Sequence, residues 1–193
     1  MVIEKCPNCK SEFHADSVFE IISEDIPKEI FRRIWNIGTD RINSLYICSP
    51  FMSPFKGTRQ DPDEGKKFFD TLQKIGKNLT SSEQFVIVTR QKADYSEHRP
   101  TVDSYFQNCA ARVYFRKDLH TKLYLIGADS LSFAVFGSPN LTHKARTNVE
   151  MGVFVTDLDE YNKFERAWWQ MIRDKQTKEF RGRDQQGNDI ITQ

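Results

Sequence analysis

The apolar run Phe85-Val86-Ile87-Val88 limits the possible folds of this chain more than any other stretch. It is short, rich in β-branched residues, and shows no alternation between apolar and polar positions. A strand with one face in water alternates, whereas an unbroken apolar run is typical of a strand covered on both faces. The run Leu45-Tyr46-Ile47, within 43–49, has the same character. We therefore expect central strands of a sheet with helices on its faces.

Helical patterns lie between and after these strands. Asp25-Ile26-Pro27 is typical of a helix start, with proline at the first helical position, and Asp61-Pro62 repeats this signal. Asp157 and Glu160 have the spacing of a capping box. The apolar positions that recur at helical spacing after these three starts are Ile30, Phe31, Ile34 and Trp35; Phe68, Phe69, Leu72 and Ile75; and Leu158, Tyr161, Phe164, Trp168 and Ile172. We also expect a short helix over 101–111.

Length and charge set the domain organisation. The chain has 193 residues, of which 38% are hydrophobic, and this is enough for one main domain with a core. We divide it into an N-terminal Cys-x-x-Cys segment (1–24), a main domain (25–175) and a polar, loosely ordered C-terminal tail (176–193). The 28 Lys and Arg residues balance 27 Asp and Glu residues, so affinity for a phosphate backbone must come from local clusters. No apolar run reaches the ~18 residues of a membrane span, and no signal pattern begins the chain. We expect a cytoplasmic protein with no membrane partner.

The cysteines suggest one candidate metal site. Cys6-Pro7-Asn8-Cys9, followed by His14, is typical of half a zinc knuckle, because such a turn places two thiolates on one ion. The second half is missing, and Asp16 is the other nearby ligand type. Two interpretations stay open: a structural zinc held by Cys6, Cys9 and His14, or a turn with reduced thiols. Cys48 lies in an apolar run and is expected to be a core thiol.

Three polar motifs in close succession carry the functional signal. His120-Thr121-Lys122 opens an apolar run that continues to Ile126, and residues two apart on a strand share a face. The expected strand 131–136 ends in Gly137-Ser138-Pro139-Asn140, which supplies a hydroxyl and an amide at a turn where a ligand can approach the backbone. Asn148-Val149-Glu150 opens a third apolar run. Together these groups suit a phosphate.

The order of the motifs resembles the phospholipase D-like superfamily, whose signature is His-x-Lys, then Gly-Ser-x-Asn, then a downstream acidic residue. The resemblance implies an α/β fold with a mixed sheet of about seven strands flanked by helices. One departure is that Gly127 stands where the family commonly has an aspartate, with Asp129 two residues later. That aspartate mainly supports the site in the family, so the chemistry is retained.

The resemblance also assigns roles to the motif residues. His120 is the nucleophile that forms a phosphohistidine, and Glu150 orients its ring. The non-bridging phosphate oxygens are held by three residues: Lys122, Ser138 and Asn140. The lysine neutralises charge that magnesium neutralises in other enzymes, so catalysis needs no metal or other cofactor.

Substrate contacts are expected from loops at the carboxyl ends of the strands, where ligands gather in α/β sheets. Prolines in 50–61 force the chain out of the sheet there, and the polar segment 90–100 carries several basic residues; if it borders the same site, its charge attracts a polyanion. The alternative interpretation of 90–100 is a solvated loop. The expected substrate-binding residues are Ser49, Phe51, Arg90, Lys92 and Lys144.

A single His-x-Lys motif cannot act as nucleophile and general acid at once. We therefore expect a homodimer with a shared active site, in which His120 of the partner protonates the leaving group. His98 or His143 of the same chain is the alternative acid. The function we expect is a nuclease that cleaves DNA or RNA, such as a restriction or defence module. The alternatives are a phospholipid head-group phosphodiesterase or transferase, and a non-catalytic nucleic-acid-binding or dimerisation module of a larger protein.

Overall fold

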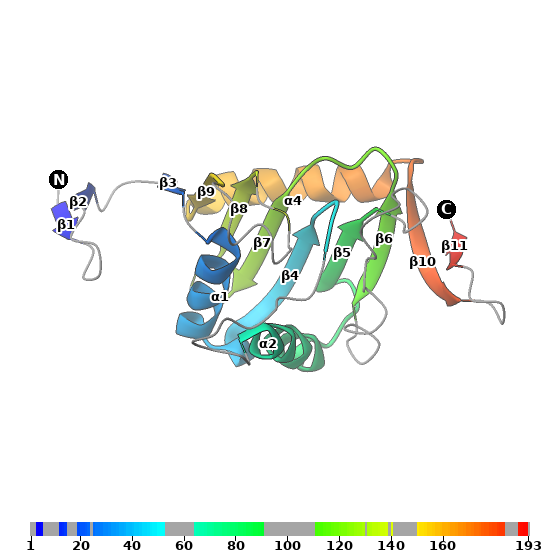
Figure 1. The fold of residues 1–193 in the computed structure, drawn as a ribbon, viewed down its shortest axis with the longest axis horizontal. Helices are drawn as coiled ribbons and strands as arrows, with labels where there is room; N and C mark the ends of the chain where they lie inside the picture. Colours follow the sequence, from blue (N-terminus) through cyan, green and yellow to red (C-terminus); the bar gives the residue numbers. More distant parts are fainter. Residues whose placement is uncertain are drawn as a thin grey trace.

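The protein is a mixed β-sheet with helices on both faces (Figure 1). The computed structural model describes residues 3–5, 12–14, 19–23, 25–52, 64–90, 111–129, 131–138, 140, 150–183 and 189–192. The main sheet of these residues has nine strands, so the expected α/β class is confirmed and the expected count of about seven is too low. No helix in the described ranges is long and apolar enough to span a membrane.

The sheet has a parallel centre and antiparallel flanks. Its strands, in spatial order, are β11 (Asp189–Thr192), β10 (Thr177–Arg183), β6 (Arg112–Arg116), β5 (Phe85–Thr89), β4 (Ile42–Cys48), β7 (Leu123–Ala128), β8 (Phe133–Gly137), β9 (Gly152–Val155) and β3 (Phe19–Ile22). β5 pairs in parallel with β4 and with β6, and every other neighbouring pair is antiparallel. The two apolar runs that suggested a covered sheet are therefore adjacent strands at its centre.

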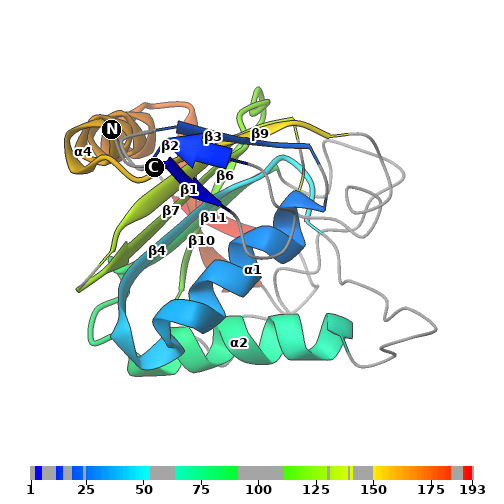
Figure 2. The ribbon, with the colours of Figure 1, turned by 90° about the vertical axis from the view of Figure 1, so that its left-hand side faces the viewer.

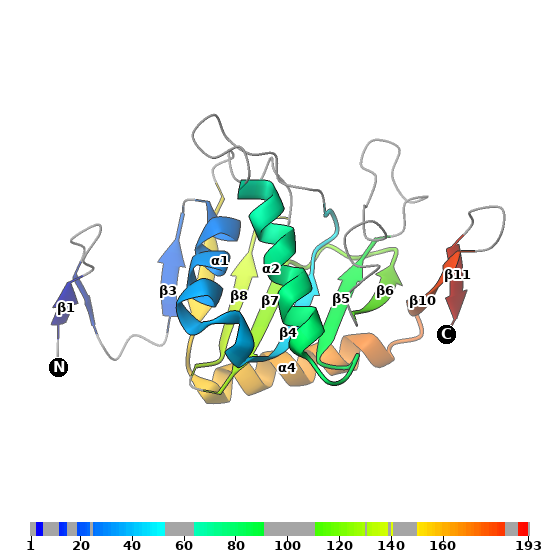
Figure 3. The same ribbon diagram turned by 90° about the horizontal axis from the view of Figure 1, so that it is seen from below.

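Helices cover both faces of this sheet, as Figures 2 and 3 show. α1 (Ile26–Ile37) and α2 (Glu64–Asn78) lie on one face, and α4 (Leu158–Arg173) lies on the other. The side chains of β5 alternate between the two cores: Phe85 and Ile87 pack with α1 and α2, whereas Val86 and Val88 pack with α4. This double coverage explains why the strand is apolar throughout.

The helix starts agree with the capping signals. Asp25 caps α1 in a left-handed conformation (φ 34°) and accepts a hydrogen bond from the Lys28 amide at 3.3 Å. Asp157 caps α4 and accepts from the Glu160 amide at 2.9 Å. Two expected core positions are wrong: Trp35 is 44% exposed and Leu158 is 61% exposed. The indole of Trp35 instead donates to Thr71 Oγ1 of α2 at 3.0 Å, and Leu158 is the first residue of α4. A short helix η1 (Thr39–Arg41) follows α1.

The segment 176–193 was expected to be a loosely ordered tail, and this is wrong for its two strands. β10 pairs with β6, and β11 pairs with β10 as the outermost strand on that side. Phe180 packs edge-on against Phe115, with ring centroids 5.5 Å apart, and Ile191 is partly buried against the same core. Backbone hydrogen bonds to β6 hold this hairpin at the edge of the sheet. The polar composition of the segment therefore did not indicate strands.

The N-terminal residues form a hairpin of their own. β1 (Ile3–Lys5) pairs with β2 (Glu12–His14) in antiparallel register, with Ile3 opposite His14. The strands flank the Cys-x-x-Cys motif in sequence. Cys6 and Cys9 themselves, residues 101–110 of the expected helix and the Phe69 side chain lie outside the described residues.

Candidate functional site

Five strand termini lie together along one side of the sheet, where β4, β5 and β8 end and β7 and β9 begin. β4 and β5 run parallel and end at Cys48 and Thr89. β7 is antiparallel to β4, so its first residue, Leu123, lies opposite Cys48. β8 then ends where β9 begins, with Gly137 opposite Gly152. This topology gathers at one edge the residues that follow or precede those strands: Ser49, Arg90, His120, Lys122, Ser138 and Glu150.

The His-x-Lys motif lies just before a strand. β7 begins at Leu123, so the expectation that His120 and Lys122 lie inside the strand is wrong. The motif backbone is nevertheless held on both sides. The Lys122 carbonyl accepts from the Gly137 amide at 3.3 Å, and the Thr121 carbonyl accepts from the Cys48 thiol at 3.6 Å. The His120 side chain is exposed to solvent.

Hydrogen bonds join the second motif to the acidic residue. The Ser138 amide donates to the Met151 carbonyl at 3.0 Å, and the Met151 amide donates to Ser138 Oγ at 3.0 Å. Ser138 Oγ in turn donates to the Glu150 carboxylate. Ser138 and Glu150 are therefore fixed side by side.

Gly137 allows this close approach. A Cβ atom there would lie 2.2 Å from the Met151 carbonyl oxygen, a backbone atom that has little freedom to move. We expected the glycine to let a ligand approach the backbone. In the structure the neighbouring strand occupies that space, so the glycine serves the pairing of β8 with β9.

The floor of the site is buried. Ser49 is fully buried, donates to the Phe51 carbonyl at 2.7 Å and makes a hydrogen bond with Tyr124. Burial raises the pKa of Tyr124, and the nearby Glu150 charge adds to the rise. A direct contact between Ser49 and a substrate would require this packing to open. Asn140 is partly buried, and its Oδ1 atom has no hydrogen-bond partner among the described residues.

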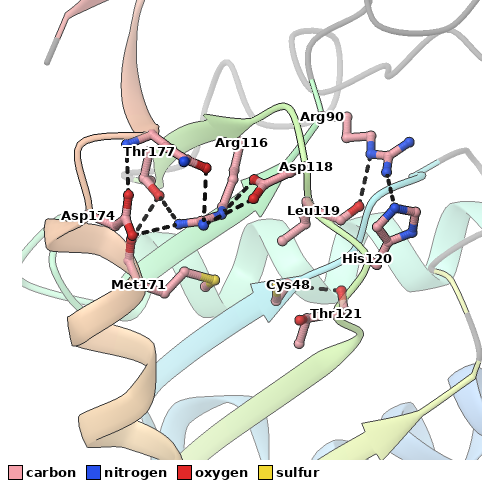
Figure 4. Close-up of polar contacts among 11 residues, drawn as sticks. Cys48, Arg90, Arg116, Asp118, Leu119, His120, Thr121, Met171, Asp174 and Thr177 are labelled. Atoms are coloured by element: carbon pink, nitrogen blue, oxygen red, sulfur yellow. Dashed lines mark hydrogen bonds and ion pairs between the residues drawn. The ribbon is translucent and has the colours of Figure 1, made fainter.

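Arg90 lies against the motif histidine (Figure 4). Its Nη2 atom is 3.0 Å from His120 Nε2, and its Nε atom donates to the Leu119 carbonyl at 2.8 Å. The guanidinium carbon lies 5.7 Å from the centre of the Phe51 ring, within range of a cation–π contact. Of the expected substrate-binding residues, Arg90 thus contacts His120, and Phe51 lies next to Arg90.

A pocket of about 500 Å³ opens beside His120. Its lining residues are Arg90, Lys117, Asp118, His120 and Gln176. Three of these are not predicted from the sequence, because Lys117 and Asp118 lie in a turn after β6 and Gln176 lies in the segment expected to be a tail. The cluster of turn-forming polar residues directly before the motif was the one available signal.

Arg116 holds Asp118, one of the residues that line this pocket (Figure 4). Its guanidinium makes two hydrogen bonds to Asp118, at 2.8 and 3.2 Å, and lies 3.5 Å from the Asp174 carboxylate. It also donates to Thr177 Oγ1 at 3.3 Å. The pairing with Arg116 partly neutralises the charge of Asp118 beside Arg90 and Lys117.

Several expected features are placed differently or are not described. Glu150 contacts Ser138, whereas His120 contacts Arg90, so the orienting contact between Glu150 and His120 stays a prediction. Four expected residues lie outside the described residues: Lys92, His98, His143 and Lys144. Within the described part of the chain, no group of three His, Cys, Asp or Glu side chains could hold a metal ion. Cys48 is a buried free thiol, as expected, and burial raises its pKa to about 12.

Solved structures with this architecture include a phospholipase D family member, Nuc from Salmonella typhimurium. It is 17% identical, with a TM-score of 0.54 over 85% of this chain and 99% of that chain. NucT from Helicobacter pylori is 14% identical, with a TM-score of 0.50 over 80% of this chain and 96% of that chain. The chain has the phospholipase D-like fold.

A longer protein with the same fold is also similar. Phosphatidylserine synthase from Haemophilus influenzae Rd KW20 is 15% identical, with a TM-score of 0.50 over 88% of this chain and 42% of that chain. The chain therefore spans less than half of that synthase and nearly all of the two phospholipase D-like chains above. No protein-family model matches the sequence, and no curated protein matches it.

Proposed function

We propose that this protein is a nuclease that hydrolyses phosphodiester bonds in DNA or RNA. The observation that carries the proposal is the hydrogen bond from the Gly137 amide to the Lys122 carbonyl, continued by the bond from Ser138 to Glu150. These two contacts bring three motifs, separate in the sequence, to one sheet edge. The similar structures include the phospholipase D family member Nuc and NucT, and the match covers 99% and 96% of those two chains.

The reaction proceeds in two displacements. An unprotonated nitrogen of His120 attacks the phosphorus, a P–N bond forms, and the P–O bond to the leaving nucleotide breaks. The general acid protonates the leaving oxygen. Water then attacks the phosphorus and gives a proton to the same group, now acting as a base. The P–N bond breaks, and His120 is regenerated.

The neighbouring residues stabilise the charge on the phosphoryl group. Lys122 supplies a full positive charge to the non-bridging oxygens, so the proposal needs no metal ion for catalysis. The side-chain amide of Asn140 can donate a further hydrogen bond. Ser138 Oγ has a single proton, and Glu150 accepts it in this structure. If Glu150 turns to His120 Nδ1 when substrate binds, Ser138 can donate to the phosphate.

The general acid is proposed to come from a second chain. In-line displacement places the acid opposite the nucleophile, and a single His120 cannot occupy both positions. A symmetric homodimer supplies a second His120 with one motif per chain. His98 and His143 are the acids to consider if each chain acts alone.

The proposal is tested with the purified protein on single- and double-stranded DNA and RNA, with and without chelator. His120→Ala serves as the inactive control. Cleavage of a nucleic acid by the wild type, and not by His120→Ala, supports the proposal. Turnover of phospholipid vesicles without nucleic-acid cleavage would replace it with a lipid phosphodiesterase. Nucleic-acid binding without cleavage would indicate a non-catalytic module.

A further inference from the structure

Arg90 holds the side chain that the proposed reaction uses as nucleophile. A guanidinium has five N–H donors and no acceptor, so the 3.0 Å contact between Nη2 and His120 Nε2 requires a lone pair on Nε2. The proton of neutral His120 then lies on Nδ1. In this arrangement the lone pair needed for attack through Nε2 is occupied by Arg90.

The Nε atom of Arg90 makes a separate hydrogen bond to the segment that carries the motif. Arg90 Nε donates to the Leu119 carbonyl at 2.8 Å, one residue before His120. This bond keeps the guanidinium beside the motif even if Nη2 leaves Nε2. The Nη groups can turn toward another acceptor while the Nε–H bond stays in place.

The pocket beside Arg90 and His120 provides room for that acceptor. Arg90 and Lys117 both line it, and Asp118 is already paired with Arg116. Phosphate oxygens accept paired hydrogen bonds from guanidinium, and these are stronger than a single bond to a neutral imidazole. A phosphate entering the pocket therefore competes for Arg90 and has the advantage.

We propose that Arg90 is a positioning residue with two alternative partners, His120 Nε2 in the resting protein and a substrate phosphate in the complex. Transfer of Arg90 to the phosphate exposes the His120 lone pair when a phosphodiester is present to receive its attack. The inference rests on the proposed function for its chemical purpose. The two contacts it predicts can be measured without any catalytic turnover.

The first measurement tests whether Arg90 covers the lone pair. Diethyl pyrocarbonate acylates unprotonated imidazole nitrogen, and the rate at His120 is followed by peptide mass spectrometry in phosphate-free buffer. Arg90→Gln should raise this rate about three- to tenfold, the range expected for loss of a partly exposed hydrogen bond to a charged donor. Lys117→Gln is the matched control, since it removes a positive charge from the same pocket and leaves the contact between Arg90 and His120 intact. Its rate should equal that of the wild type.

The second measurement tests the phosphate partner. Calorimetric titration with inorganic phosphate should give binding that is about tenfold weaker in Arg90→Gln, because a charge-assisted pair is lost. The loss in Lys117→Gln should be smaller than about threefold. Circular dichroism and thermal melting of each variant show whether its fold is retained. If Arg90→Gln does not fold, Arg90→Lys replaces it, because lysine keeps the charge and loses the paired donors.

The two measurements overturn the inference in different ways. Equal acylation of His120 in the wild type and in Arg90→Gln would mean that Arg90 does not cover the lone pair. Equal increases in both variants would reduce the effect to general charge. Unchanged phosphate affinity in Arg90→Gln would remove the second partner. Failure of the nuclease assay alone would leave both contacts standing and would remove only the proposed function.

Discussion

The Gly137 amide donates a 3.3 Å hydrogen bond to the Lys122 carbonyl, and this contact aligns the two central motifs of the site. Gly137 can take this position because the neighbouring strand approaches closely, with Met151 O only 2.2 Å from the place of a Cβ atom. The alignment of the site therefore depends on the absence of a side chain at residue 137.

Gly137→Ala should destabilise the protein and reduce activity together. The added methyl group must push β9 away, and overpacking of this kind costs about 1–3 kcal/mol. The same shift separates Ser138 from Glu150. Chemical denaturation measures the first effect, and turnover measures the second. Ser138→Ala is the control, because it removes the side-chain hydrogen bonds without forcing the strands apart. A Gly137→Ala protein as stable as the wild type would show that β8 and β9 can move apart there without loss of stability.

Local patterns were sufficient to predict the centre of the fold. The unbroken apolar runs of β4 and β5 indicated strands covered on both faces, and Asp25 with Pro27 indicated the start of α1. The motif order predicted which segments meet, because strand ends in such a sheet share an edge. Each of these signals lies within a few consecutive residues.

Contacts between distant polar residues could not be predicted in the same way. Arg116 and Asp174 are brought together by the pairing of β6 with β10. No local sequence pattern predicts that pairing. The contact of Arg90 with His120 depends on β5 ending beside the segment before β7. The sequence named Arg90 among the expected substrate-binding residues, but its contact with His120 is known only from the structure.

His120→Ala should abolish turnover and leave the fold almost unchanged. The side chain is exposed, so its removal costs little core packing, and surface changes of this kind are usually within about 0.5 kcal/mol. Lys122→Ala should weaken both turnover and substrate affinity, because it removes the charge next to the phosphate. Lys163→Ala, an exposed lysine on α4, is the matched control and should change neither quantity. Near-normal turnover in His120→Ala would mean that the motif is coincidental.

Cleavage should survive chelation, because Lys122 and the histidines take the part of a metal ion. A strict requirement for magnesium would contradict this mechanism. If Cys6 and Cys9 hold zinc, prolonged chelation would lower activity slowly through loss of folding, and Cys6→Ser would reproduce that loss. Elemental analysis separates the two effects. Less than about half an equivalent of zinc per chain would argue against the knuckle.

Glu29 should contribute to stability at neutral pH and lose that contribution in acid. Burial opposes ionisation of its carboxylate, but hydrogen bonds from Arg32 and Arg33 outweigh burial and lower its pKa. A lowered pKa in the folded state gives stability above the usual value of 4.5, and this is lost as the pH falls through the folded pKa. Glu29→Gln should therefore cost about 1 kcal/mol at pH 7, after allowance for solvent screening, and much less at pH 3. Denaturation at both pH values tests this, with Glu83→Gln as the control because the Glu83 side chain is 68% exposed.

The shared active site predicts a distinct result when active and inactive chains are mixed. Wild-type and His120→Ala chains are unfolded together in equal amounts and refolded, so that subunits pair at random. If each phosphate needs His120 from both chains, activity remains only in wild-type pairs, which are roughly a quarter of all dimers. If each chain carries a complete site, roughly half of the activity remains, because the sites act independently. With subunit exchange confirmed by mass spectrometry, a value near one half would move the general acid to His98 or His143 of the same chain.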